Sequence, residues 1–581
     1  MRIKGEWYFS SAADIAAASA PPNLPSNNPN PRPPSQWRPG DFPIGSPNNA
    51  GANWPVSDLV KDANGVWSFT TPLPSGWFTY QLFKDCDAAA PDLSGCTPLS
   101  DPSNPPWNTV GTIERTSQVY VPSDPAFGTE DLSWQAPAPA DKRGKIASIL
   151  YPSPLSTNPV GNHYAAVYLP PGYDPNRETP YPLYVLTHGG GGNEVNWSTQ
   201  GAMGPIVDNL LAAGKIQPAV IVMPNNNALA APGYASDVPN ALVPYMESNY
   251  NVSKLPSGRA ASGLSGGARA LNDILFGNTT AFGYYGIWSI PGNVPDAGAP
   301  AYANPALKAL LGLEVVNGIQ DIGANAGPFS TAMQQRLTAA GIPFRNYSVN
   351  GGHNWAYWRL ILRDFLTNVA FRATKTDVAA NAGTRTVTAS VVPATAEPAV
   401  PTGTVQFLAG GQPLGAPVTL VAGKASLVVP STVGASSVTA SYGGDTLYNA
   451  SSGSTAYSAS STNGTVGGSV PATLSLSLGA PASFGAFVPG RDGTYSAQST
   501  ANVISTAGDA ALTVSDPGHL ANGAFALADP LVVSLSKSSW TAPVANDPVT
   551  IAFSQHIGAT QALRTGSYSK TLTFTLSTTT P

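Results

Sequence analysis

Ser265 lies in the pentapeptide Gly263-Leu-Ser-Gly-Gly, which has the G-x-S-x-G pattern of a nucleophilic serine. In that pattern the serine stands on a sharp turn between a strand and a helix, and small neighbours let the backbone turn and expose the hydroxyl. A chain with 58 glycines can produce the pattern by chance, so its surroundings decide. The short stretch 258–262, small apart from Arg259, predicts a buried strand, and apolar residues recur at helical spacing from Ala268 and Leu271 onward. We therefore expect strand, turn and helix in the order that exposes a reactive serine.

A serine hydroxyl is a weak nucleophile and needs a base, usually a histidine. The chain has five histidines, and two of them, His519 and His556, fall in a tail that reads as all-β. In an α/β-hydrolase the order along the chain is serine, acid, histidine. His353 alone follows the serine within the same predicted domain, in Gly351-Gly-His-Asn-Trp between a strand and a helix. We predict that His353 is the base, the alternative being a structural histidine.

Four carboxylates lie between the predicted nucleophile and the predicted base: Asp273, Asp296, Glu314 and Asp321. Asp273 is expected on the helix behind the serine, and Asp296 in a loop rich in Pro and Gly. Glu314 is expected inside the strand Leu313–Asn317. Asp321 follows the carboxyl end of that strand, where α/β sheets carry their functional loops. We predict that Asp321 orients the histidine, with Glu314 as the alternative.

A glycine run is placed where an oxyanion-binding loop belongs. His188 and the four glycines 189–192 follow the predicted buried strand Leu183–Thr187. Glycines there let backbone N–H groups approach the oxygen that gains negative charge. We predict that the amides of Gly189, Gly190 and Gly266 are the donors and that His188 orients the loop. The alternative is a flexible turn.

Four separated motifs occur in one order: Tyr168-Leu-Pro-Pro-Gly-Tyr, Tyr181-Pro-Leu-Tyr-Val-Leu-Thr-His-Gly-Gly-Gly-Gly-Asn-Glu-Val-Asn-Trp, Gly263-Leu-Ser-Gly-Gly and Gly351-Gly-His-Asn-Trp-Ala-Tyr-Trp-Arg. Together they resemble the esterase D family, which includes secreted feruloyl and acetyl xylan esterases, enterochelin esterases and mycolyltransferases. The resemblance implies an α/β-hydrolase fold and an acid three residues after a glycine, as Asp321 is after Gly318. One departure is that the family usually has Met after the serine, whereas Gly266 follows here. The amide survives that change, but the packing of the helix start is expected to differ.

The 581 residues are too many for one core, and the composition changes along the chain. Strand and helix patterns alternate from Tyr164–Leu169 to Arg345–Val349, as in a mostly parallel sheet, whereas alternating Thr and Val residues follow. The N-terminal part contains Asn64-Gly-Val-Trp, Pro72-Leu-Pro-Ser-Gly-Trp-Phe-Thr-Tyr and Ser100-Asp-Pro-Ser-Asn-Pro. With these segments it resembles the immunoglobulin-like (E-set) module that precedes many secreted esterases and is related to starch-binding domains. Gly403-Thr-Val-Gln-Phe, Ala425-Ser-Leu-Val-Val and Val438-Thr-Ala-Ser-Tyr-Gly-Gly-Asp resemble a bacterial immunoglobulin-like repeat. We predict an α/β-hydrolase flanked by all-β sandwiches. The four predicted domains are an N-terminal β module (1–135), an esterase domain (143–372), a domain that resembles this repeat (373–460) and a C-terminal β module (470–581).

Composition limits the partners and the compartment. Charged residues make up 10% of the chain, and glycine and proline are abundant, which is typical of extracellular β-rich modules. The net charge of −5, with no Lys/Arg run, argues against nucleic acid and anionic membranes as partners. We expect no transmembrane segment, no metal site and no cofactor. Cys86 and Cys96 are expected to form a local disulfide, the alternative being two free thiols. The first residues read as a strand rather than a signal peptide, which leaves open whether the natural protein begins upstream.

The predicted function is that of a secreted carboxylic-ester hydrolase acting through an acyl-enzyme. By resemblance, its substrate is an acyl or feruloyl group on a polysaccharide. Alternatives are an enterochelin-type siderophore esterase, a polyester or aryl-ester hydrolase, and a surface adhesin with an inactive hydrolase domain. Trp197, Trp288 and Trp355 are expected to present aromatic surface to the substrate, although tryptophans are more often core residues. The sequence leaves the oligomeric state open.

Overall fold

The computed structural model describes residues 1–18, 32–43, 56–90, 92–101, 103, 115–124, 130–321, 326–396, 399–458 and 473–578. The chain divides into two compact units, Met1–Ser461 and Thr462–Pro581. Each unit is described by itself below. No helix among the described residues has the length and hydropathy needed to cross a membrane.

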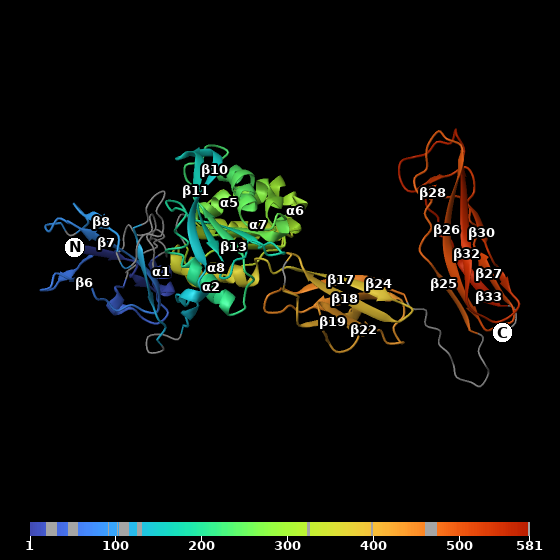
Figure 1. Ribbon diagram of the computed structural model, residues 1–581, viewed down its shortest axis with the longest axis horizontal. Helices are drawn as coiled ribbons and strands as arrows, with labels where there is room; N and C mark the ends of the chain where they lie inside the picture. Colours follow the sequence, from blue (N-terminus) through green and yellow to red (C-terminus); the bar gives the residue numbers. More distant parts are fainter. Residues whose placement is uncertain are drawn as a thin grey trace. The chain divides into compact units, whose positions relative to one another are not determined.

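A seven-stranded sheet forms the centre of the first unit (Figure 1). Its strands stand in the order β10 (Lys145–Thr157), β11 (Val160–Leu169), β13 (Val220–Pro224), β12 (Leu183–Thr187), β14 (Arg259–Leu264), β15 (Tyr284–Trp288) and β16 (Gly312–Val316). The pairs β10–β11 and β11–β13 are antiparallel, and the remaining neighbours are parallel. This is the predicted α/β-hydrolase sheet. The pattern at Arg345–Val349, however, yields only a single bridge, between Glu314 and Arg345, and no further strand.

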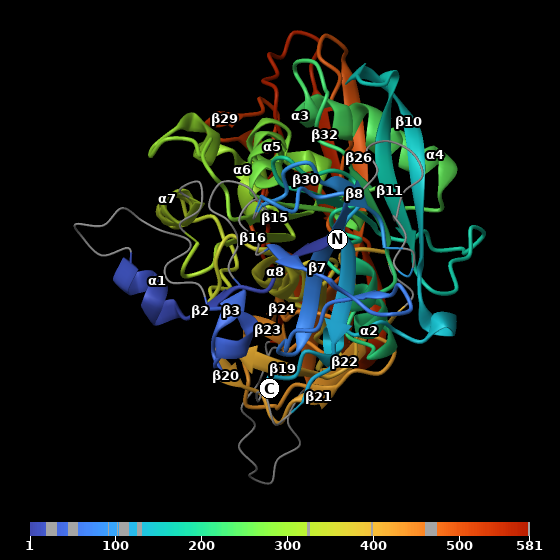
Figure 2. The same ribbon diagram turned by 90° about the vertical axis from the view of Figure 1, so that its left-hand side faces the viewer.

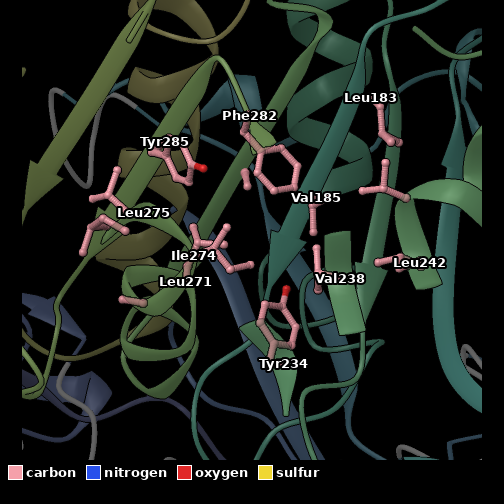
Figure 3. Packing of buried hydrophobic residues seen from close by; sticks show 14 of the residues in the cluster. Leu183, Val185, Tyr234, Val238, Leu242, Leu271, Ile274, Leu275, Phe282 and Tyr285 are labelled. Carbon is pink, nitrogen blue, oxygen red and sulfur yellow. The ribbon is translucent and has the colours of Figure 1, made fainter. Parts of the chain in front are cut away.

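Helices cover both faces of this sheet, which explains why its central strands are apolar on both sides. Neighbouring residues of a strand point to opposite faces: Tyr184 packs against the layer of α2 (Met203–Ala212) and α8 (Trp355–Asn368), whereas Val185 packs against the other layer. That other layer contains α3 (Tyr234–Asp237), α4 (Val243–Asn249), α5 (Gly266–Gly277), α6 (Pro305–Lys308) and α7 (Ala326–Ala339). Figure 3 shows part of its core, where Leu271, Ile274 and Leu275 of α5 face Val185 and Tyr285.

An antiparallel sheet forms the N-terminal module and faces the viewer in Figure 2. It contains β4 (Val56–Asp58), β1 (Arg2–Gly5), β7 (Gly76–Lys84), β8 (Thr97–Leu99) and β9 (Ser117–Val121). Cys86 and Cys96 form a disulfide in the loop between β7 and β8, as predicted. Trp77 of β7 is buried against the esterase fold: its indole N–H donates to the Thr199 carbonyl (3.2 Å), and its own carbonyl accepts from Arg359 of α8 (2.8 Å). The module is thus packed onto the helix that follows His353.

Two sheets after α8 form a small sandwich with its own core. One contains β17 (Thr374–Asn381), β18 (Thr386–Pro393) and β22 (Lys424–Val428), and the other is built on β19 (Thr404–Ala409), β23 (Ser436–Tyr442) and β24 (Ser451–Tyr457). Thr395 of this sandwich is buried, and its hydroxyl donates to the Ser257 carbonyl (2.6 Å) of the hydrolase fold. The sandwich therefore packs against the esterase domain.

The second unit is also all-β. A sheet in the order β25 (Leu474–Leu478), β26 (Gly493–Ser505), β32 (Val544–Ile557), β30 (Val532–Leu535) faces a smaller one of β31 (Ser539–Trp540), β27 (Ala510–Val514) and β33 (Phe574–Thr578). Side chains of both sheets share a core around Val503, Leu512 and Ile551. The exact limits of the four domains stay a prediction.

Candidate active site

Ser265 stands on the sharp turn that its sequence pattern predicts. β14 ends at Leu264, α5 begins at Gly266, and the serine between them has φ +51° and ψ −121°. Positive φ is strained for a residue with a Cβ, so the surrounding bonds must hold it. The Ser265 N–H donates to the Trp288 carbonyl (2.9 Å), and its carbonyl accepts the first helical bond from Arg269 (3.1 Å). The hydroxyl is therefore held at the carboxyl edge of the sheet.

The small residues of the pattern have a steric reason at Gly267. A Cβ at that position would collide with the His188 carbonyl and lie 2.9 Å from the Thr187 side chain. Glycine thus lets the start of α5 approach the carboxyl end of β12, where the glycine loop begins. The helix start and the loop are brought together by this close approach.

His353 joins the serine to a buried carboxylate. Its Nε2 lies 2.9 Å from Ser265 Oγ, and its Nδ1 lies 2.9 Å from Asp321 Oδ1. The Asp321 side chain is fully buried, and the His353 side chain is 14% exposed. Since a carboxylate accepts, Nδ1 carries the proton and Nε2 is left to accept the serine proton. This arrangement can activate a serine as a nucleophile.

Asp321 and His353 are held together by a residue that the sequence gave no reason to select. Gln320 accepts from the Gly351 N–H through Oε1 (2.8 Å) and donates through Nε2 to Asn350 (3.1 Å). Its own N–H donates to the Gly351 carbonyl (3.1 Å). The loop that carries Asp321 (the acid loop) and residues 350–354, which carry His353 (the histidine loop), are therefore joined by three hydrogen bonds next to both functional groups.

Asn354, directly after the histidine, serves two elements. Its Oδ1 accepts from the Tyr357 N–H (3.0 Å) and so caps α8, and its Nδ2 donates to the Pro43 carbonyl of the N-terminal module (2.7 Å). The histidine loop thus rests on a capped helix and on the neighbouring module.

The glycine loop lies beside the serine. A Cβ at Gly189 would lie 3.3 Å from Ser265 Cβ, and one at Gly266 would lie 2.8 Å from the Gly190 nitrogen. Backbone of Gly189, Gly190 and Gly266 therefore converges beside the hydroxyl. That these amides bind the oxyanion stays a prediction.

His188 fixes that loop in the way the sequence predicts. Its Nδ1 donates to the Gly189 carbonyl (2.7 Å), and its Nε2 accepts from the Asn226 N–H (3.0 Å). The ring is buried, and burial lowers the pKa of His188 to about 4. The neutral ring has one donor and one acceptor nitrogen, which is what these two bonds require.

Three consecutive asparagines after β13 complete the support, and sequence reasoning missed them. Asn226 donates through Nδ2 to the His188 carbonyl (3.0 Å), and Asn227 donates to the Gly192 carbonyl (2.8 Å). Asn225 donates to Glu194 (2.7 Å), whose carboxyl is buried. The available signal was the asparagine run itself, at the carboxyl end of a buried strand.

The expectation that tryptophans present a surface to the substrate is wrong. Trp197 and Trp288 are 0% exposed and Trp355 is 5% exposed. Trp197 packs edge-to-face against the other two rings, with centroids 5.8 and 5.1 Å apart, and its N–H donates to the Thr187 carbonyl (3.0 Å). These rings are the core beneath the site.

Glu314, the alternative acid, lies elsewhere. Its side chain is fully buried, and its nearest cation is Arg345, at 3.9 Å. Burial, together with the neighbouring Asp364, raises the pKa of Glu314 well above its usual value. It makes no hydrogen bond to His353 among the described residues.

Parts of this chain are similar to known proteins. Residues 156–295 match the putative esterase family, and residues 372–459 match the bacterial Ig-like domain (group 3). An endo-1,4-beta-xylanase/feruloyl esterase from Xylanibacter ruminicola is 29% identical over 263 residues, which are 42% of this chain and 33% of that protein. Endo-1,4-beta-xylanase Y from Acetivibrio thermocellus is 32% identical over 130 residues, which are 21% of this chain and 11% of that protein. The chain thus spans a third or less of these relatives' length.

Solved structures were also compared. A ferulic acid esterase is 22% identical, with a TM-score of 0.35, over 39% of this chain and 98% of its own. A mutant feruloyl esterase module from Clostridium thermocellum, complexed with sinapinate, is 24% identical, with a TM-score of 0.36, over 41% of this chain and 92% of its own.

Proposed function

We propose that this chain, whose residues 156–295 match the putative esterase family, is a serine carboxylesterase that releases acyl groups from their alcohols. The observation that carries the proposal is the chain of contacts from Asp321 through His353 to Ser265, with 2.9 Å at each step. It stands on a turn that exposes the serine and beside a loop of glycine amides.

The reaction follows from these positions. Ser265 Oγ attacks the ester carbonyl carbon while its proton passes to His353 Nε2. The carbonyl oxygen becomes an anion and accepts from the amides of Gly190 and Gly266, with Gly189 beside them. Asp321 holds the Nδ1 proton and stabilises the imidazolium. His353 then protonates the leaving oxygen, the ester C–O bond breaks, and an acyl-enzyme remains.

A water molecule then hydrolyses the acyl-enzyme. His353 takes a proton from the water as its oxygen attacks the acyl carbon, and then returns the proton to Ser265 Oγ as the acyl bond breaks. The products are the free acid and the regenerated enzyme. Every step uses groups of this chain and water.

The proposed substrate is an acyl or feruloyl ester of a polysaccharide. The support is the name of the Xylanibacter relative, which joins a xylanase to a feruloyl esterase. The low charge and the high glycine and proline content support export to the extracellular space or cell surface, where such polymers are found.

The test replaces the nucleophile in the full chain. Ser265→Ala should abolish hydrolysis of a short chromogenic ester and of a feruloylated oligosaccharide, and should abolish covalent labelling by a fluorophosphonate. Ser248→Ala changes an exposed serine on α4 and is the matched control. Labelling that persists in Ser265→Ala would refute the assignment, and hydrolysis of the chromogenic ester alone would refute the polysaccharide substrate only.

A further inference from the structure

A cleft of about 490 Å³ adjoins the glycine loop and the start of α5. Gly190 and Gly266, which we assign to the oxyanion, line one part of it, and Arg269 and Ala270 line another. Among the described residues, none of the histidine loop, 350–354, lines the cleft. Ser265 is not among the lining residues either, so the cleft adjoins the two glycines assigned to the oxyanion rather than the nucleophile or the base.

Proton transfer decides which half of an ester belongs there. The leaving oxygen must come within hydrogen-bond reach of His353 Nε2, since that nitrogen gives it the proton. The alcohol half therefore extends on the side of the histidine loop. The acyl half leaves the carbonyl carbon in another direction, and this cleft lies beside the oxyanion amides.

The walls of the cleft are polar. Asn226, Asn227 and Asn293 line it, and Tyr234 is its one aromatic residue. Tyr234 is only 6% exposed, and its hydroxyl is bonded to Thr187. The Nδ2 groups of these asparagines already donate within the protein, but a wholly apolar acyl chain would cover their side-chain oxygens without offering a donor. The lining therefore suits an acyl group that carries a polar substituent.

Arg269 supplies the charge. It is the fourth residue after Ser265, so it lies one helical turn further along the same face of α5. The side chain is exposed and makes no ion pair or hydrogen bond with another described residue. Asp273, one turn on, is already bonded to Asn293. The guanidinium is thus free to bind an acceptor on a ligand in the cleft.

We propose that this cleft is the acyl-binding subsite and that Arg269 selects acyl groups bearing an oxygen substituent, phenolic or carboxylate, at their far end. The inference rests on the proposed esterase activity. It adds that the cleft holds the acyl half of the ester and that Arg269 recognises the oxygen substituent of that half.

The experiment compares methyl esters that differ only in the acyl group: acetate, cinnamate, 4-hydroxycinnamate and 4-carboxycinnamate. Kinetics of the full chain are measured for the wild type, Arg269→Ala and Arg269→Lys. Arg115→Ala, an exposed arginine of the N-terminal module, is the matched control. Arg269→Ala should lower kcat/KM about tenfold or more for the two oxygen-bearing esters, because a hydrogen bond to a charged group is lost. Acetate and cinnamate should change less than about twofold.

The substituted esters also separate the two oxygen types. A greater loss for the carboxylate than for the phenol in Arg269→Ala, restored in part by Arg269→Lys, means that charge dominates. Equal losses for the two esters that Arg269→Lys does not restore mean that the paired N–H donors of the planar guanidinium dominate. Either pattern supports the proposal.

Two results would overturn the subsite without touching the esterase activity. One is an equal change for all four esters. The other is a change that follows the alcohol when methyl and arabinosyl esters of one acid are compared. Failure of the esterase proposal is recognised separately, by unchanged hydrolysis in Ser265→Ala.

Discussion

Asp321 and Glu314 are buried carboxylates of one chain segment with opposite surroundings. Asp321 accepts from the imidazole of His353, whereas burial raises the pKa of Glu314 well above its usual value. We expect Asp321→Asn to lower kcat by up to about 10⁴ without unfolding the protein. Glu314→Gln keeps the size of the side chain and should lower kcat by less than about threefold, because no hydrogen bond joins Glu314 to His353 among the described residues. The reverse order of damage, measured on a short ester, would transfer the role to Glu314.

Ser265 and His353 should act as one unit. Each alanine variant is expected to lower kcat by on the order of 10³–10⁶, and the double variant should be little worse, because either loss already removes nucleophilic catalysis. Steady-state kinetics of both single variants and the double variant test this. Losses that multiply would mean that the two side chains work independently.

His188 gives a pH dependence that comes from the oxyanion loop. Its pKa of about 4 in the folded protein lies below the ordinary value of 6.5, so the unfolded chain binds more protons between these values. The contribution of the neutral ring to the free energy of unfolding is present in full above pH 6.5. It is lost as pH falls toward 4, and the total loss is about 3 kcal/mol. Calorimetry at pH 7.5 and 4.5 should show a smaller decrease in Tm for His188→Gln than for the wild type. Equal decreases would assign the effect to other groups.

At the scale of elements, periodicity and turn chemistry predicted most of the sheet. β11, β12, β13, β14 and β15 appear where alternation or apolar runs place them, because buried parallel strands must be apolar. The sharp turn at Ser265 and the glycine loop were also predictable, since each needs small residues at fixed positions. The burial of the three tryptophans was not predictable, because their spacing does not show that α8 and the N-terminal module cover the rings.

The asparagines after β13 show why the supporting residues stayed hidden. Asn226 contacts His188 because β12 and β13 are neighbours in the sheet, and that order is not written in either segment. Gln320 and Gly351 likewise meet only when the acid loop and the histidine loop fold against each other. Hydrogen bonds between loops depend on this tertiary placement, whereas the reactive residues carry local motifs.

At the scale of the molecule, the point of truncation should decide whether the esterase domain survives alone. A chain ending at Thr374 would remove Thr395 from Tyr284 and would leave Arg372 without the Thr446 carbonyl. It would also expose Phe371, which is 4% exposed in the full chain. A chain ending at Ser461 keeps the whole first unit.

We therefore expect the chain ending at Ser461 to keep both kcat and the Tm of the esterase transition. The shorter chain should lose about 5 °C or more in Tm, while any folded fraction keeps its kcat. Calorimetry and active-site titration of both chains measure this. Equal Tm values would mean that the contacts of Thr395 and Arg372 contribute little.

The backbone angle of Ser265 has an evolutionary consequence. A positive φ costs about 1–2 kcal/mol of conformational free energy for every residue type except glycine. The catalytic serine at this position therefore makes the fold less stable. Ser265→Gly should be inactive yet raise Tm by about 2–4 °C relative to Ser265→Ala, which is equally inactive but keeps the strain. A gene copy released from selection for hydrolysis would gain stability by drifting to glycine here. The calorimetric difference between the two variants measures what this backbone angle costs in stability, which is the cost that selection for the hydroxyl has to outweigh.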